Sequence, residues 1–210
     1  MLPTNGRGPA IFVGDAPALD FLNSIATPVD ATIDWIDDGK GLLEWLKQAR
    51  LAPLDALETI RAAAPPSELD SAADQARRLR EWFRDLIQRH MGRPLSLETL
   101  EELQPLNRLL ERDETFRRIT MQRETGQTSL ELETMRRWRS PEALLLPIGE
   151  ALAQFVCTEN FSNVKSCRAE ACTLLFVDHT RGRVRRWCSM ALCGNRAKQA
   201  AHRRRLSARH

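Results

Sequence analysis

The chain has 210 residues, of which 42% are hydrophobic and 28% are charged. This composition is typical of a globular protein with a buried core, and no apolar run reaches the roughly 18 residues that a membrane-spanning helix needs. The first residues lack the basic and then apolar pattern of a signal peptide, so we expect a cytoplasmic protein with no membrane partner.

Charge is distributed unevenly along the chain. Residues 164–210 hold 12 of the 31 lysines and arginines and 2 of the 28 acidic residues, a net charge of +10, which leaves −7 for residues 1–163. A basic C-terminal segment on a mildly acidic body indicates a polyanionic partner, although a solvated charged end would have the same composition. With DNA as that partner, we expect the protein to be associated with the nucleoid.

Apolar residues recur with helical spacing through the first two thirds of the chain. Leu19, Leu22 and Ile25 share one face after Asp15, which is a candidate helix cap. In the longest predicted helix, Ser67 is the candidate cap. Proline is expected to end or break two of the predicted helices, at residues 65–66 and at Pro105. The further helices are predicted within residues 37–51, 53–66, 67–92 and 96–113.

The apolar period changes to two between Phe116 and Met135. Apolar and polar residues alternate through 116–121 and again through 130–135 on either side of a turn at 124–127, which predicts a β-hairpin. Residues 140–160 then predict a last helix, with Ser140 as N-cap and Pro141 at the first helical position. Cys157 lies in this helix, where we expect a buried structural thiol.

The other four cysteines form two matched pairs, Cys167-x4-Cys172 and Cys188-x4-Cys193. Four thiolates satisfy the tetrahedral preference of Zn²⁺, whereas disulfides are rare in a reducing cytoplasm. Disulfides or free thiols are the alternatives. We predict one Zn²⁺ per chain, held by four protein ligands that leave no open catalytic position. The sequence contains no recognisable catalytic motif, so we expect no enzymatic activity.

The segment between the cysteine pairs predicts a hairpin. Residues 173–178 are a strand-like run, 179–183 contain a turn glycine, and 184–188 would return as the second strand. In the interpretation we favour, Ser189 caps the following helix and Cys193 lies in its first turn. The alternative begins the helix at Asn195 and places Gly194 at positive φ.

These motifs resemble a known family. CRAEAC, LLFVD and RRWCSMALCGNRAKQAAHRRR resemble the CGNR zinc finger, and GDAPALDFLNSI with GLLEWLKQARL resembles the ABATE domain that precedes it in bacterial stress-induced transcription regulators. The resemblance implies zinc ligation by the four paired cysteines, and its tail signature covers Gly194, Asn195, Arg196 and Lys198. It also implies a mainly helical domain with a β-hairpin in residues 1–160, followed in 161–210 by a treble-clef-like knuckle–hairpin–helix module.

The basic helix is the candidate DNA-binding element. Arginines neutralise phosphates and read guanine edges, and glutamine can read adenine. We expect Arg196 either to read bases or to support the zinc knuckles. RNA or protein contacts are the alternative use of the module. The candidate DNA contacts are Arg185, Arg186, Arg196, Lys198, Gln199, Arg203 and Arg204.

The body also contains polar residues beside an apolar helix stripe. Asp20 and Asn23 are candidates for a ligand pocket that would make the body a sensor for a small-molecule effector, although such residues more often hydrogen-bond neighbouring loops. The body could instead mediate dimerisation, so a homodimer is a further possibility.

Overall fold

The computed structural model describes residues 8–27, 31–124 and 127–199. Helices dominate, and the strands form three separate antiparallel pairs. The α-helices are α1 (Pro17–Leu22), α2 (Gly39–Ala49), α3 (Leu54–Ala63), α4 (Pro66–His90), α5 (Gln104–Leu110) and α6 (Leu146–Thr158). Shorter helical turns are η1 (Leu97–Leu103), η2 (Pro141–Leu145), η3 (Phe161–Asn163) and the π-helical η4 (Met190–Gly194).

Helix α1 lies at the centre of the core, where it contacts α4, α6 and strand β6. Its residues Leu19, Phe21 and Leu22 are fully buried. The long helix α4 packs closely against α2 at Gly39. A Cβ added to Gly39 would lie only 2.4 Å from the Cβ of Leu69, so a side chain here would clash. The apolar stripes predicted for α2 and α4 are buried.

Proline and cap positions decide where the helices begin and end. Helix α3 ends before Pro65, and Pro105 marks the change from the 3₁₀ turn η1 to α5, as predicted. Two predicted caps are wrong. Ala16 occupies the N-cap of α1 while Asp15 takes a left-handed φ of 58°, and Pro65 occupies the N-cap of α4 instead of Ser67. A proline at the first helical position sets the helix start in both cases.

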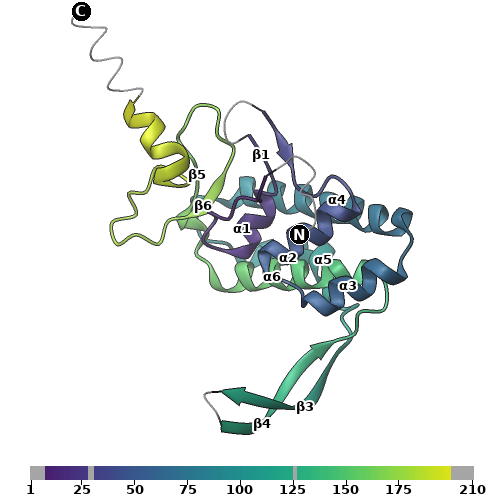
Figure 1. Cartoon of the computed structure of the whole chain (residues 1–210). Helices are drawn as coiled ribbons and strands as arrows, with labels where there is room; N and C mark the ends of the chain where they lie inside the picture. Colours follow the sequence, from purple (N-terminus) through teal and green to yellow (C-terminus); the bar gives the residue numbers. More distant parts are fainter. Residues whose placement is uncertain (1–7, 28–30, 125–126, 200–210) are drawn as a thin grey trace, which may run out of the picture.

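The predicted β-hairpin is present and projects from the helical body. Strands β3 (Thr115–Glu124) and β4 (Gln127–Arg136) pair in a register that runs from Thr115↔Arg136 to Glu124↔Gln127. Figure 1 shows this ribbon projecting from the helical body, at the opposite end of the molecule from the C-terminal helix. We call the β3–β4 ribbon the arm.

The short strand pairs join neighbouring loops. Ile25, predicted in the first helix, lies instead in β1 (Ile25–Ala26), which pairs with β2 (Ile33–Asp34). Strand β6 (Leu175–Val177) pairs with β5 (Val164–Ser166), so the predicted pairing of 173–178 with 184–188 is wrong. Residues 184–188 form no strand, because Asp178 holds the intervening loop in turns through its hydrogen bonds to the Thr180 and Arg185 amides.

The hydrophobic core is continuous from the helical body into the cysteine-rich module. It includes Phe83 and Leu152 of the body together with Cys167, Phe176 and Val177. In the described ranges, no helix combines the length and apolar character needed to cross a bilayer.

Candidate metal centre

The four paired cysteines converge on one point. Cys167 follows β5, Cys172 ends the first loop, Cys188 precedes the C-terminal helix and Cys193 lies in its first turn. Their sulfur atoms all lie within 4.8 Å of one another. The Sγ–Sγ distances are 3.5 Å between Cys188 and Cys193 and 3.9 Å between Cys172 and Cys188.

This arrangement fits a tetrahedral zinc ion. Zn–S bonds of about 2.3 Å separate the sulfurs of a tetrahedral site by roughly 3.8 Å, close to the observed distances. Cys167, Cys188 and Cys193 are buried and Cys172 is half-buried, so the site is largely closed to solvent. The backbone amide of Cys188 donates to Cys167 Sγ at 3.4 Å, a bond that stabilises a thiolate.

The pKa values of the neighbouring thiols show why the cluster favours a bound cation. A hydrogen bond from Cys188 lowers the pKa of Cys172 to about 5. Hydrogen bonding to Cys172 raises the pKa of Cys188, and burial raises the pKa of Cys193 to about 11. Four neighbouring thiolates therefore repel one another, and a divalent metal supplies the charge that allows all of them to ionise.

The start of the C-terminal helix positions Cys193. Ser189 is the N-cap, as predicted, and its hydroxyl accepts from the Leu192 amide at 2.9 Å. The amides of Cys193 and Gly194 both donate to the Ser189 carbonyl, which widens the turn to a π-helix. A Cβ on Gly194 would lie 2.5 Å from Met190 Sδ, so any larger residue here would require the Met190 side chain to move. Asn195 has helical φ of −68°, and the alternative helix start there is wrong.

Arg196 contacts the zinc knuckle. Its Nε donates to the Leu192 carbonyl at 2.5 Å, and a terminal nitrogen lies 3.4 Å from Cys193 Sγ. A guanidinium beside a ligating sulfur neutralises part of the thiolate charge and orients the ligand. Of the two roles considered for Arg196, this geometry favours support of the knuckle.

Arg185 joins the module to the body. Its guanidinium lies 4.1 Å above the Phe176 ring and pairs with the carboxylate of Asp15. The same group donates to the carbonyls of Val13 at 3.2 Å, Trp187 at 3.0 Å and also Cys188. Its donors are turned towards the protein, so Arg185 positions the module against the body, which does not support its prediction as a DNA contact.

Asp178 is a structural centre that the sequence analysis missed. Its carboxylate is fully buried and accepts from Lys165 Nζ at 2.6 Å, from the amide and hydroxyl of Thr180, and from the Arg185 amide. Burial alone would raise its pKa, but these hydrogen bonds outweigh burial and hold the pKa well below the usual range. An aspartate directly after the buried run LLFV was the available signal.

The remaining predicted DNA contacts are exposed where they are described. Arg186, Lys198 and Gln199 are exposed, and residues 195–199 are helical. Arg203 and Arg204 lie outside the described residues.

The two candidate pocket residues bond to the backbone. Asp20 accepts from the Gly14 amide at 2.8 Å, and burial raises its pKa to about 6. The Asn23 side chain exchanges two 2.9 Å hydrogen bonds with the backbone of Leu175 in β6. Asn23 thus acts as a clamp between α1 and the cysteine-rich module, and the pocket hypothesis gains no support.

Cys157 differs from its prediction as a buried thiol. It is exposed on α6, because the inward face of this helix is formed by Ile148, Leu152 and Phe155. It does not belong to the metal cluster among the described residues.

Four thiols around one point, with a capped helix supplying the last ligand, define a zinc finger. Residues 163–206 match the model of the CGNR zinc finger, and residues 15–159 match the ABATE family, described as "Putative stress-induced transcription regulator". The chain therefore belongs to the ABATE family and carries a CGNR zinc finger that binds one Zn²⁺ through Cys167, Cys172, Cys188 and Cys193. No curated protein matches the sequence.

Proposed function

We propose that this protein is a transcription regulator that binds duplex DNA through the exposed cations of its zinc finger. A zinc ion with four protein ligands has no open coordination position, which supports a structural rather than a catalytic role for the metal. A regulator of transcription would act at the nucleoid.

The observation that carries the proposal is the unbalanced positive charge of the finger. Of the two acids in residues 164–210, Asp178 is buried against Lys165, and Glu170 is exposed. Arg168, Arg186 and Lys198 are exposed and have no ion-pair partner in the described part of the chain. The amide of Arg168 donates to the Arg186 carbonyl at 2.9 Å, so these two residues are neighbours. Exposed, unpaired cations are the groups that release counterions from DNA.

The test measures the affinity of zinc-loaded protein for a fluorescent duplex over a range of salt concentrations. Arg186→Ala and Lys198→Ala should each weaken binding and reduce the slope of log affinity against log salt by about 0.9, as expected for one lost phosphate contact. Arg61→Ala removes an exposed arginine from α3 in the body and is the matched control, which should leave both quantities unchanged.

The same assay decides whether DNA binding depends on the folded finger. Cys193→Ser should lose both zinc and duplex affinity, whereas Cys157→Ser should keep both. Selection from a random duplex library would then reveal a preferred site. Absence of duplex binding by zinc-loaded protein at low salt, or stronger binding of single-stranded RNA, would refute the proposal.

A further inference from the structure

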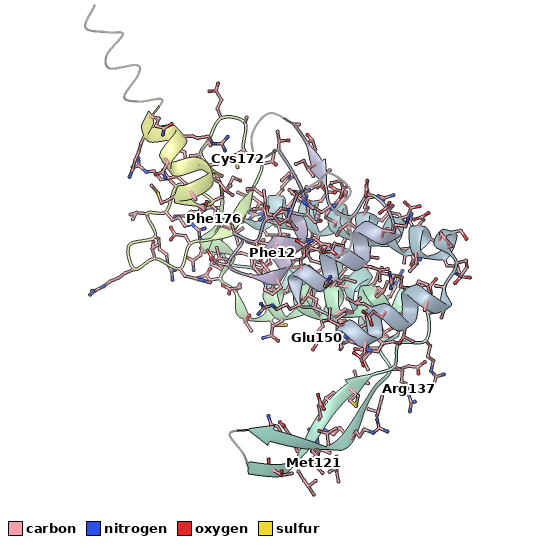
Figure 2. The ribbon with its side chains drawn as sticks, viewed as in Figure 1. Phe12, Met121, Arg137, Glu150, Cys172 and Phe176 are labelled. Carbon is pink, nitrogen blue, oxygen red and sulfur yellow. The ribbon has the colours of Figure 1, made fainter. Side chains whose placement is uncertain are left out.

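One face of the arm is apolar and exposed. The cross-strand pairs Ile119↔Leu132 and Met121↔Leu130 lie next to each other on this face. Their exposed fractions are 69% and 53% in the first pair and 62% and 75% in the second. Figure 2 shows Met121 on the outer part of the arm, away from the helices. We call these four residues the arm patch.

Beyond its root, where Phe116 pairs with Met135, the opposite face of the arm is polar. It carries the pairs Arg118↔Glu133, Thr120↔Glu131 and Gln122↔Ser129. An isolated two-stranded ribbon is at best marginally stable in water, and it gains stability when its apolar face is covered. The ribbon is therefore amphipathic without a covering element of its own in the described structure.

The root of the arm is braced in this orientation. Arg136 donates twice to the Asp113 carboxylate, at 2.8 and 2.7 Å, and once to Glu150 at 2.8 Å. Arg137 also stacks on Phe116 at 4.7 Å. The Arg136 contacts connect the arm to the segment after α5 and to α6, so the arm patch is held away from the surface of its own body (Figure 1).

The body carries a second apolar surface beside the root of the arm. A groove of about 420 Å³ lies between α4 and α5, and it is closed at one side by η2. Helix α5 leads into the arm and η2 follows it. The groove is lined mainly by apolar side chains, namely Leu79, Trp82, Pro105, Leu109 and Leu145, with Gln75 and Arg78 at its polar margin.

We propose that two copies of this chain form a two-fold symmetric dimer in which the arm patch of each copy lies in the α4–α5 groove of the other. Such an exchange satisfies both surfaces at once and closes the assembly, because each protomer contributes one arm and one groove. A second copy suits the patch better than a foreign protein, because this chain itself carries the apolar groove that the patch needs.

The area agrees with a stable dimer. Four apolar side chains with these exposures present on the order of 500 Å², the size of a functional surface patch. In two arm–groove contacts the arm patches alone would contribute about 1,000 Å², so the interface reaches the lower limit for a specific interface before the surface of the two bodies is added. Two arm patches packed only on each other would bury about 1,000 Å², near the lower limit for a specific interface. The zinc finger lies at the other end of the molecule, so this dimer leaves both fingers accessible.

The first test is the mass of the zinc-loaded full chain in light scattering at tens of micromolar protein. The expected mass is twice that of the 23.9 kDa chain. Met121→Glu combined with Leu130→Lys should give a monomer, because the charged pair is compatible with the hairpin but not with an apolar groove. Gln122→Glu with Ser129→Lys places the same pair on the polar face at the same part of the arm, and this control should remain a dimer.

The second test traps the contact between arm and groove. In a Cys157→Ser background, chains with Leu79→Cys are mixed with chains carrying Leu130→Cys and oxidised mildly. A disulfide-linked heterodimer is expected, whereas Ser129→Cys on the polar face should form none with Leu79→Cys. A monomeric wild-type chain, a control pair that dissociates as fully as the patch variant, or equal cross-linking from both arm faces would overturn the proposal. None of these measurements involves DNA, so they are independent of the proposed function.

Discussion

At the scale of single residues, the finger shows that arginines close together in the sequence can have different roles. Arg185 and Arg196 direct their guanidinium groups to carbonyls, a carboxylate and a zinc-ligand sulfur, whereas the exposed Arg186 has no ion-pair partner among the described residues. Arginine has five donors in a planar fork, so it can bridge several loop carbonyls that no other side chain would satisfy together. A basic segment therefore contains residues that hold the fold together as well as residues without such contacts.

Arg196→Ala tests this distinction. Removing a partner of a metal ligand commonly lowers metal affinity by about 10- to 100-fold, and we expect a loss of this size measured by competition with a chromogenic chelator. Lys198→Ala, two residues further along the helix, is the control and should keep wild-type zinc affinity. Full zinc retention by Arg196→Ala together with lost discrimination between DNA sequences would instead make Arg196 a base reader.

At the scale of elements, one largely buried ion pair connects strand β2 with the long helix α4. Arg80 is 2% exposed and binds both carboxylate oxygens of Asp34, at 2.8 and 2.6 Å, and the Ser24 hydroxyl at 2.9 Å. Burial of Asp34 opposes ionisation, but the hydrogen bonds and charge of Arg80 outweigh it and keep the pKa of Asp34 below its usual range. The pair orients a short strand that has little packing of its own.

Asp34→Asn should destabilise the chain at pH 7 by about 3 kcal/mol, because it leaves the buried Arg80 charge with only the exposed carboxylate of Glu81 as an ionised partner. A depressed folded-state pKa contributes stability above the unfolded value of about 4, and this contribution is lost as the pH falls through the folded value. The difference between variant and wild type in urea unfolding should therefore shrink below about pH 4.

Asp74→Asn is the matched control, since Asp74 pairs with Arg77 on the exposed surface of the same helix. Its expected cost is below about 1 kcal/mol. Equal effects of the two substitutions would show that the Asp34–Arg80 pair has no special role.

At the scale of the whole molecule, the zinc finger is part of the hydrophobic core. The Val177 amide donates to the Gly14 carbonyl at 2.9 Å, and Asn23 is bonded to both backbone groups of Leu175. These contacts connect the finger with both the N-terminal segment and α1. The ABATE and CGNR regions thus meet across a buried, hydrogen-bonded contact, although each matches its own family model.

Removal of zinc should therefore weaken the body as well as the finger. We expect a strong chelator to lower the thermal midpoint of the helical body by roughly 5–10 °C and to speed amide exchange in α1. Asn23→Ala should lower the midpoint of the zinc-loaded chain and reduce the further effect of chelation, because it removes the clamp beforehand. A finger that unfolds while exchange in α1 stays unchanged would mean that the two parts are energetically independent.

The local features of the chain could be predicted from its sequence. Helical periodicity indicated α2 to α4, alternation of apolar and polar residues indicated the arm, and the spacing of the cysteines indicated a four-thiol zinc site. The Ser189 cap and the break at Pro105 were also predicted correctly. Each of these features depends on residues a few positions apart, whose preferences act before any distant contact forms.

Only the tertiary structure decided which distant groups meet. β6 pairs with β5 because the first cysteine loop joins these strands directly, and Asp178 keeps the following segment in turns. Asn23 binds Leu175 across 152 positions of sequence, and Arg185 reaches Asp15 across 170. The sequence indicated polar or basic side chains at these positions, but their partners depend on packing of the whole chain. That packing turned a presumed pocket residue into a clamp and a presumed DNA contact into the connection between finger and body.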